Sequence, residues 1–345
     1  MNAVRPEVNS PKMDSTNGVC GLTNIGNTCY GNAVLQAIRN HVDLTLFFIQ
    51  DKHLPLLKTQ DSKDMLESYV NLLKLMWTST GVEKTKVFWK EMVSLAIKKS
   101  YDQFQFPHPH DAHEFLGFLL DQFHEGLSQP VTMHLRSTSK TETSSALSFW
   151  KKSFEKGYSP LVELSFSLRR KCTRCEKCKN ESITWETFNI LDVSMGTPEQ
   201  TLMDLILADG KGDELEDYHC LACSPEKTKA TVLRSNWRLG SWLIITLKRF
   251  DNHQRRINTV IDIPLETTFT PSFHPTSPEP SFRDTYELFA TINHHGAAGG
   301  GHYTSQAKHP VTGKWNLFDD ERTTPLPSPV IDQSTYIIMY RKKSD

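Results

Sequence analysis

The period of the hydrophobic pattern changes along this chain, and that change restricts the fold more than any other feature. Across residues 21–127 apolar side chains recur at i, i+3, i+4 and i+7, for example over 65–76, which predicts helices with one buried stripe each. Over 161–168 the period falls to two, as in a β-strand, and residues 242–247 are almost entirely apolar, as in a strand covered on both faces. The patterns predict an α+β fold, with a helical lobe followed by a largely antiparallel β lobe.

Charge and hydropathy argue against two classes of partner. Lysine plus arginine total 39 against 40 aspartates and glutamates, so the formal net charge of −1 provides no overall field to hold nucleic acid. No apolar run approaches the roughly 18 residues that a membrane-spanning helix needs. We therefore expect neither a nucleic-acid partner nor a membrane partner.

Three segments lack a regular hydrophobic period. Residues 1–18 contain prolines and charges without the apolar core of a secretory signal, so we expect a disordered leader there. Residues 129–148 are rich in serine and threonine, and residues 270–280 are rich in proline. Both compositions are typical of loops or insertions rather than domain linkers.

The chain has seven cysteines, an odd number, and four of them form two C-x-x-C pairs. This usage favours a metal and a reducing compartment over a disulfide framework, so we expect a cytoplasmic or nuclear protein. The paired cysteines are Cys172 with Cys175 and Cys220 with Cys223.

Two such pairs can complete a tetrahedral site for one Zn²⁺ ion, which would be structural because no ligand position is left for water. The alternatives are two unrelated reduced pairs or a vestigial site. The nearby Cys178 and His219 are further candidate ligands, and the pattern does not decide their roles.

Cys29 is a candidate nucleophile because of its place in the sequence. Turn and capping residues occupy 26–28, and a helical period begins directly after Cys29, so its thiol should lie in the first turn of a helix. The positive end of a helix dipole favours an anion, and such a thiol can have its pKa lowered from ~8.5 to about 3.5–7.5. Asn24 lies on the same loop, where its amide could face an oxyanion formed beside the sulfur. The alternative is a small buried cysteine beside a turn asparagine.

His302 and two adjacent aspartates are candidates for the base and its orienting acid. A turn at 312–313 predicts a hairpin whose register places His302 opposite Asp319 and Asp320. A carboxylate there could hold Nδ1–H of the imidazole and leave Nε2 free to accept a thiol proton. Register cannot choose between the two aspartates, since a slip of one residue changes the face. A strand histidine and a solvated turn are the alternative reading.

These motifs together resemble the ubiquitin-specific protease family of deubiquitinating cysteine peptidases. The segment GLTNIGNTCYGNAVLQ at 21–36 is similar to the family's cysteine box, and GGHY followed by WNLFDD is similar to its histidine box. PHDAHEFL at 109–116 resembles the family's helix box, with Pro109 and His110 replacing two glutamines, and LKRF at 247–250 matches a strand end of the family. The motifs follow the family's order over residues 21–341.

The resemblance implies a role for each catalytic candidate. Cys29 would be the nucleophile, His302 the general base and Asp319 the orienting acid. Asn24 would stabilise the oxyanion, and Asp320 would assist the oxyanion or support the histidine loop. Contacts with the arginine- and glycine-containing tail of ubiquitin would come from four further residues, namely Asp111, Arg249, Phe250 and Tyr303.

The resemblance also implies the architecture and the partners. The expected fold is that of a papain-like cysteine peptidase with a helical thumb, a mixed palm and antiparallel β fingers tied by a structural Zn²⁺ on the two C-x-x-C pairs. One catalytic domain would span 19–343, with the thumb at about 19–128 and the fingers and palm at about 129–343. The expected partner is ubiquitin or a ubiquitinated protein, bound by a monomeric catalytic domain to which a regulatory subunit could attach.

Three other functions are open at this stage. An enzyme of the same fold could prefer a ubiquitin-like modifier, such as SUMO or the interferon-induced two-domain modifier. A catalytically silent ubiquitin-binding scaffold is disfavoured because Cys29, His302 and Asp319 are all intact. A zinc-ribbon nucleic-acid binder would use the basic cluster at 169–179, which we expect the acidic stretch at 213–217 to offset.

Overall fold

The computed structural model describes residues 13–15, 17–57, 60–79, 81–99, 108–135, 141–195, 201–251, 253–279, 283–297 and 300–343. The chain divides into two compact units. The first contains residues up to Leu127 together with Phe289–Pro329, and the second contains Ser128–Leu288 together with Val330–Asp345. Most of the expected leader at 1–18 lies outside the described residues.

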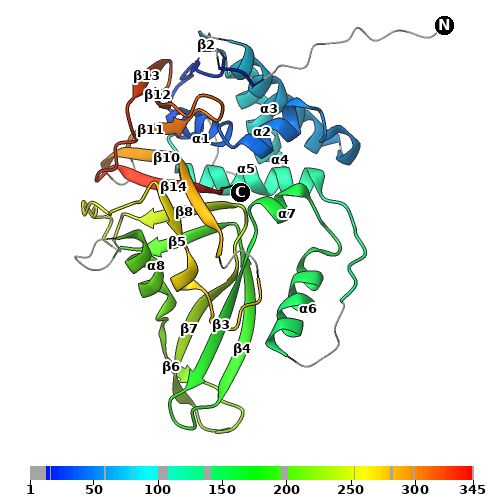
Figure 1. Cartoon of the computed structure of the whole chain (residues 1–345), viewed down its shortest axis with the longest axis vertical. Coiled ribbons are helices and arrows are strands. Elements are labelled where there is room, and N and C mark those ends of the chain that lie inside the picture. Colours follow the sequence, from blue (N-terminus) through cyan, green and yellow to red (C-terminus); the bar gives the residue numbers. More distant parts are fainter. Residues whose placement is uncertain are drawn as a thin grey trace, which may run out of the picture. The chain divides into compact units, whose positions relative to one another are not determined.

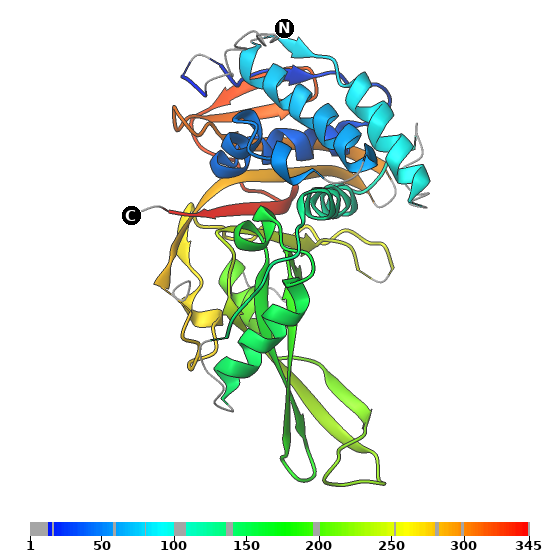
Figure 2. The same cartoon turned by 90° about the vertical axis from the view of Figure 1, so that its right-hand side faces the viewer.

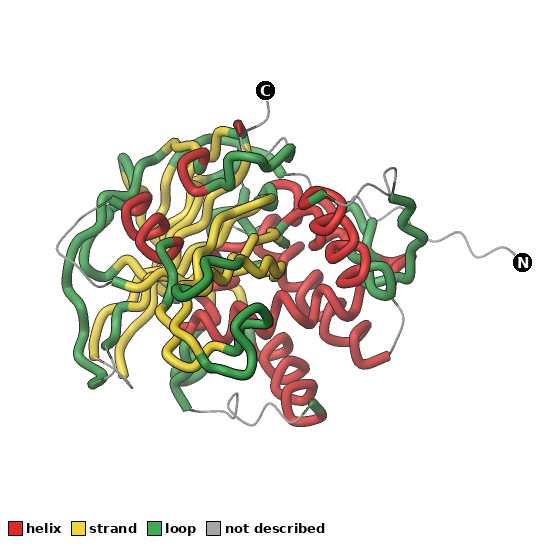
Figure 3. Tube along the Cα trace, turned by 90° about the horizontal axis from the view of Figure 1, so that it is seen from below, coloured by secondary structure: helices red, strands yellow, loops and turns green. Residues whose placement is uncertain are grey.

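The first unit begins with helices, most of which bury one face as their hydrophobic period predicts. Helix α1 is buried along its whole length, and α3 packs against both α4 and α5. Figure 3 shows these helices in red, packed side by side. The helices of this unit are α1 (Cys29–Ile38), α2 (Val42–Ile49), α3 (Gln60–Thr78), α4 (Lys86–Lys98) and α5 (Ala112–Leu127), with a short 3₁₀ helix at Leu54–Leu56.

The strands of the first unit come mostly from the other end of the chain. An antiparallel meander in the order β10, β11, β12, β13 packs against α1 through β11 and β12 (Figure 1). Its members are β10 (Thr285–Ala297, of which this unit contains the part from Phe289), β11 (Gly300–Lys308), β12 (Trp315–Asp319) and β13 (Arg322–Leu326). A separate parallel pair is formed by β1 (Gly21–Leu22) and β2 (Val82–Glu83). The C-terminal hairpins therefore lie on the helix that begins with Cys29.

The second unit contains a long four-stranded antiparallel sheet in the order β4, β3, β7, β6. Figure 2 shows the β3–β4 turn and the β6–β7 connection at the same end of this sheet. Its strands are β3 (Ser167–Cys175), β4 (Glu181–Phe188), β6 (Glu214–Tyr218) and β7 (Thr228–Arg238). This arrangement brings segments about 45 residues apart in sequence to one tip, as antiparallel pairing requires.

A second group of strands in this unit surrounds β8 (Trp242–Lys248). It pairs antiparallel with β14 (Thr335–Lys342) and parallel with β5 (Ile190–Ser194), while β9 (Glu266–Thr268) pairs with Thr285–Glu287 at the start of β10. The first six residues of β8 are buried, which confirms the strand predicted over 242–247. This unit also contains the short helices α7 (Pro160–Leu164) and α8 (Leu202–Gly210) and a 3₁₀ helix at Thr270–Ser272.

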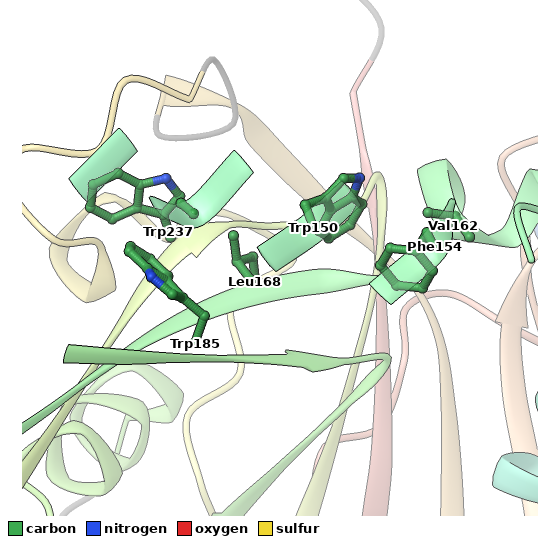
Figure 4. Close-up of a cluster of buried hydrophobic side chains, with 7 residues drawn as sticks. Trp150, Phe154, Val162, Leu168, Trp185 and Trp237 are labelled. Atoms are coloured by element: carbon green, nitrogen blue, oxygen red, sulfur yellow. The ribbon is translucent and has the colours of Figure 1, made fainter. Parts of the chain in front are cut away.

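Helix α6 (Glu142–Phe154) packs on the four-stranded sheet at the end away from the β3–β4 turn. Trp150 and Phe154 from the helix pack with Leu168, Trp185 and Trp237 from the strands (Figure 4). Large aromatic side chains dominate this cluster, and burial of each stabilises the unit by about 1.5–3 kcal/mol. The indole N–H of Trp185 donates to Ser145 Oγ at 3.0 Å, so its polar atom is also satisfied.

Two local predictions were wrong. Residues 142–148 belong to α6 rather than to a loop, because Thr141 and Ser144 form a capping box that starts a helix with a buried aromatic face. Residues 161–164, the first half of the strand predicted over 161–168, belong to α7 instead, because the Ser159 side chain caps the helix and Pro160 occupies its first turn. Apolar residues four positions apart fit either a helix or a strand, so the capping residues determine which of the two forms. Among the described residues, no helix has both the length and the apolar character needed to cross a bilayer.

Candidate active site and metal centre

Cys29 is the first residue of α1, at the place where the sequence predicts it. The loop before it is shaped by Asn24, whose Oδ1 accepts hydrogen bonds from Gly26 N at 3.0 Å and from Thr28 N at 3.2 Å. Asn27 within this turn has φ 56°, in the left-handed region that asparagine tolerates. Cys29 is 7% exposed and begins a helix whose residues are all buried.

The predicted lowering of the Cys29 pKa does not hold in this structure. Burial raises the pKa of the thiol, and the nearby Asp320 carboxylate raises it further. The backbone N–H groups of Tyr303, Tyr30 and Cys29 act in the opposite direction without overcoming burial. The effect of the Tyr303 N–H on this pKa agrees with the packing of α1 against β11.

His302 and Asp319 form the closest polar contact of the site. His302 Nε2 lies 2.5 Å from Asp319 Oδ1. A carboxylate only accepts, so Nε2 carries the hydrogen and Nδ1 has the free lone pair. This reverses the predicted use of the two nitrogens. The β11–β12 ladder pairs Ser305 with Phe318 and stops there, so His302 and Asp319 lie beyond the paired residues and are not register partners.

Asp320 lies in the turn after β12 with φ 48° and serves as an acceptor for two asparagines. Its Oδ2 accepts from Nδ2 of Asn24 at 2.8 Å, and its Oδ1 accepts from Nδ2 of Asn32 at 2.7 Å. Asn32 lies on α1, three residues after Cys29, and is 1% exposed. Sequence reasoning assigned Asn32 no role, although its spacing from Cys29 could have placed it on the same side of the helix.

Two of the predicted substrate contacts lie together. The Tyr303 hydroxyl donates to Asp111 Oδ2 at 3.1 Å, while Asp111 Oδ1 caps α5 by accepting from His113 N at 2.7 Å. Tyr303 is 8% exposed, and burial raises its pKa above the ordinary value. The Asp111 carboxylate is therefore held in place by a hydrogen bond to each of its two oxygens.

Arg249, another of the predicted contacts, is enclosed within the second unit. It is 1% exposed, and its guanidinium donates to four backbone carbonyls in the second unit. These belong to Thr335, Ile257, Thr259 and Asp332. Burial lowers the pKa of Arg249 to about 10. A side chain so enclosed holds loops and strand ends together, and its contact with substrate stays a prediction.

Phe250, the last of the predicted contacts, is half-buried in the second unit. It forms an isolated β-bridge with Arg256, and the Arg256 guanidinium lies 5.6 Å from its ring centroid. This is ordinary cation–π packing at a strand end.

The structure groups four cysteines at the tip of the four-stranded sheet, but not the predicted four. Cys175, Cys178, Cys220 and Cys223 have sulfurs within 4.8 Å of one another. Cys172 lies within the ladder opposite Ile183 and Leu233, where alternation points residues 172 and 175 to opposite faces. The first knuckle is therefore Cys175 with Cys178. The exposed His219 is not in the group.

The sulfur spacing fits a tetrahedral ion. Zn–S bonds of about 2.3 Å require sulfurs about 3.8 Å apart. Cys175 and Cys223 are separated by 3.9 Å, and Cys178 and Cys220 by 3.5 Å. The four side chains thus fit a metal site with thiolate ligands.

Most of the basic cluster of the second unit is paired with acids. Five of its six cations form ion pairs, namely Arg169 with Asp209, Arg170 with Glu142, Arg174 with Glu181, Lys177 with Glu226 and Lys179 with Glu176. These acids lie outside the stretch at 213–217 that was expected to offset the cluster. That stretch pairs instead with Lys227, Lys229 and Arg234. The pairing disfavours a surface that binds phosphates.

Comparison with known proteins decides the family. The model of the family described as "Ubiquitin carboxyl-terminal hydrolase" matches residues 20–340. The chain belongs to the ubiquitin carboxyl-terminal hydrolase family. Within this family, "Ubiquitin carboxyl-terminal hydrolase Usp2" of Drosophila melanogaster is 28% identical over 345 residues, which cover 96% of this chain and 36% of the relative. Human "Ubiquitin carboxyl-terminal hydrolase 2" is 28% identical over a match that covers 96% of this chain and 56% of the relative.

Solved structures of ubiquitin hydrolases share the fold. The chain resembles one titled "Structure of the SAGA Ubp8/Sgf11/Sus1/Sgf73 DUB module bound to ubiquitin aldehyde", with a TM-score of 0.73, 19% identity and coverage of 97% of this chain and 71% of that one. The α+β fold expected from the family resemblance is confirmed. This chain spans little more than half the length of the human family member and about a third of the Drosophila one.

Proposed function

We propose that this chain is a deubiquitinase that hydrolyses isopeptide or peptide bonds after the C-terminal glycine of ubiquitin, with Cys29 as nucleophile. The observation that carries the proposal is the packing of α1, which begins with Cys29, against β11, whose His302 lies 2.5 Å from Asp319. This arrangement supports the combination of thiol, imidazole and carboxylate that a cysteine peptidase needs.

The proposed reaction follows from the free lone pair on Nδ1 of His302. Nδ1 of His302 accepts the thiol proton while Nε2–H remains bonded to Asp319, which stabilises the imidazolium that forms. The sulfur attacks the carbonyl carbon, and the Asn24 amide with the Cys29 backbone N–H stabilises the oxyanion. His302 then protonates the leaving amine, and water hydrolyses the acyl-enzyme.

Asp320 is proposed as the residue that orients Asn24. It uses one of the two N–H groups of Nδ2, so the other can point to the oxyanion. Asp111 and Tyr303 are proposed to bind the ubiquitin tail, since the Asp111 carboxylate can pair with an arginine. Phe250 is retained as a proposed contact of the tail.

We further propose that Cys175, Cys178, Cys220 and Cys223 hold one structural Zn²⁺ ion. Four thiolates leave no position for water, so the ion would stabilise the tip of the sheet and take no part in the reaction. The proposal also places residues 19–343 in one monomeric catalytic domain, to which a regulatory subunit could attach. The unpaired state of all seven cysteines supports a reducing compartment, the cytoplasm or the nucleus.

A ubiquitin with a C-terminal electrophile tests the activity. We expect one covalent adduct on Cys29, detected as a mass increase equal to the probe, and none in a Cys29→Ala variant. Parallel probes made from SUMO and from the two-domain modifier should react much more slowly. Faster labelling by either would assign the chain to that modifier, and no labelling by any probe in folded protein would refute the activity.

A further inference from the structure

A second group of metal-ligating side chains lies in the first unit, within the proposed active site. One ligand atom from each of His302, Asp319 and Asp320 lies within 4.8 Å of the other two. The side chains of His302 and Asp319 are 43% and 41% exposed, so an ion from solvent can reach them. All three lie on or next to β11 and β12, which neighbour one another in the sheet.

The local charge is net negative. Asp319, Asp320 and Glu321 are consecutive acidic residues followed by one cation, Arg322, and in the described part of the chain no lysine or arginine forms an ion pair with the three acids. The side chains of these acids form hydrogen bonds with His302, with the side-chain amides of Asn24 and Asn32 and with the Asn24 backbone N–H. Each carboxylate oxygen of Asp320 accepts one hydrogen bond and keeps a second lone pair for a metal.

We propose that His302, Asp319 and Asp320 bind one divalent ion of the Zn²⁺ type, and that this ion reversibly inhibits the enzyme. One imidazole with two carboxylates suits Zn²⁺, whereas Mg²⁺ prefers oxygen ligands alone. Ligand distances of about 2.0–2.2 Å require a nitrogen–oxygen separation of about 3.3–3.5 Å around a tetrahedral ion. The pair at 2.5 Å must therefore open slightly, which two part-exposed side chains permit.

Inhibition follows from a change in which ring nitrogen of His302 carries the proton. A neutral imidazole has one proton, and it is on Nε2 while Asp319 accepts it. A metal on Nε2 needs that lone pair, so the proton moves to Nδ1 of the same ring and none is released. Nδ1 can then no longer accept the Cys29 proton. This consequence rests on the proposed hydrolase activity, whereas the binding itself does not.

The test uses the full chain with zinc already in the cysteine cluster, dialysed against buffered Zn²⁺. Binding is measured in a Cys29→Ser background, so that the thiol supplies no ligand. We expect one additional equivalent of zinc, lost in His302→Ala and in Asp319→Ala but retained in Asp217→Ala, an exposed carboxylate of the second unit. Retention of the cluster's own zinc and an unchanged circular dichroism spectrum report that each variant is folded. Equal zinc content in all four proteins would overturn the site.

With Cys29 intact, we expect saturating Zn²⁺ to lower ubiquitin-substrate hydrolysis at least tenfold and a chelator to restore it, while equimolar Mg²⁺ has no effect. An additional equivalent that leaves hydrolysis unchanged would overturn the inhibitory role. If the chain binds the additional zinc yet hydrolyses no ubiquitin substrate, the proposed function fails and the metal site stands.

Discussion

Nδ2 of Asn24 donates a hydrogen bond of 2.8 Å to Oδ2 of Asp320, although the two residues are 296 positions apart in sequence. The same carboxylate accepts from buried Asn32 on α1. The loop before Cys29 and the turn after β12 are therefore held to each other and to the helix that presents the thiol. This linkage orients the amide that we assign to the oxyanion.

Replacement of Asn24 should reduce turnover with little effect on substrate binding. Because an oxyanion donor acts mainly in the transition state, we expect Asn24→Ala to lower kcat by about 10²–10³ with KM nearly unchanged. Steady-state hydrolysis of a ubiquitin–fluorophore substrate measures both constants. Asn180→Ala, in an exposed turn of the second unit, is the matched control. A rise in KM alone would assign Asn24 to binding instead.

Asp319→Asn should be severely impaired. The amide can donate to Nε2 and so stabilise the wrong tautomer, with the proton on Nδ1, where the thiol proton must go. We expect kcat to fall by about 10³–10⁴, as for orienting carboxylates in other triads. The free energy of unfolding should change little, since the carboxylate is part-exposed. Activity above a tenth of wild type would transfer the orienting role to Asp320.

The pH dependence of Cys29 reactivity should reflect its raised pKa. Since only the thiolate reacts, and burial shifts the pKa of Cys29 above the ordinary value, few molecules are ionised at neutral pH. We expect alkylation of Cys29 by iodoacetamide to accelerate about tenfold per pH unit between pH 7 and 9. Mass spectrometry of the Cys29 peptide separates it from the exposed Cys178. A rate that is constant above pH 7 would mean a lowered pKa.

Two cysteine variants distinguish the metal ligand sets. Cys178→Ser should lose bound zinc and lower the melting temperature, because three thiolates bind zinc more weakly than four. Cys172→Ser should keep a full equivalent of zinc, with a loss of about 1–2 kcal/mol from placing a hydroxyl in a buried strand position. Zinc content after denaturation is the measurement. The opposite result would restore Cys172 as a ligand.

Arg249→Met should act on stability rather than on substrate affinity. Removing the guanidinium leaves buried carbonyls without their donors, which we expect to cost about 3–5 kcal/mol in the free energy of unfolding. Urea unfolding measures this cost, and KM of the folded fraction should stay within about twofold. The half-buried Phe250→Ala serves as the comparison at the next position. A stable Arg249→Met protein with a raised KM would support the contact predicted from sequence.

The sequence alone determined the features that depend on neighbours along the chain. The start of a helix at Cys29 follows from turn residues and a helical period, and strand β8 follows from an apolar run. The candidate nucleophile and the candidate base could be named because their motifs are local. Family membership could be inferred for the same reason.

Tertiary structure alone decided the features that depend on distant contacts. Only folding shows that Cys178 rather than Cys172 meets Cys220, 42 residues away, because strand alternation points Cys172 elsewhere. Only folding encloses Arg249 among backbone carbonyls and turns Nε2 of His302 to Asp319. Burial and ring orientation come from contacts between segments far apart in the chain, and no local pattern of residues encodes them.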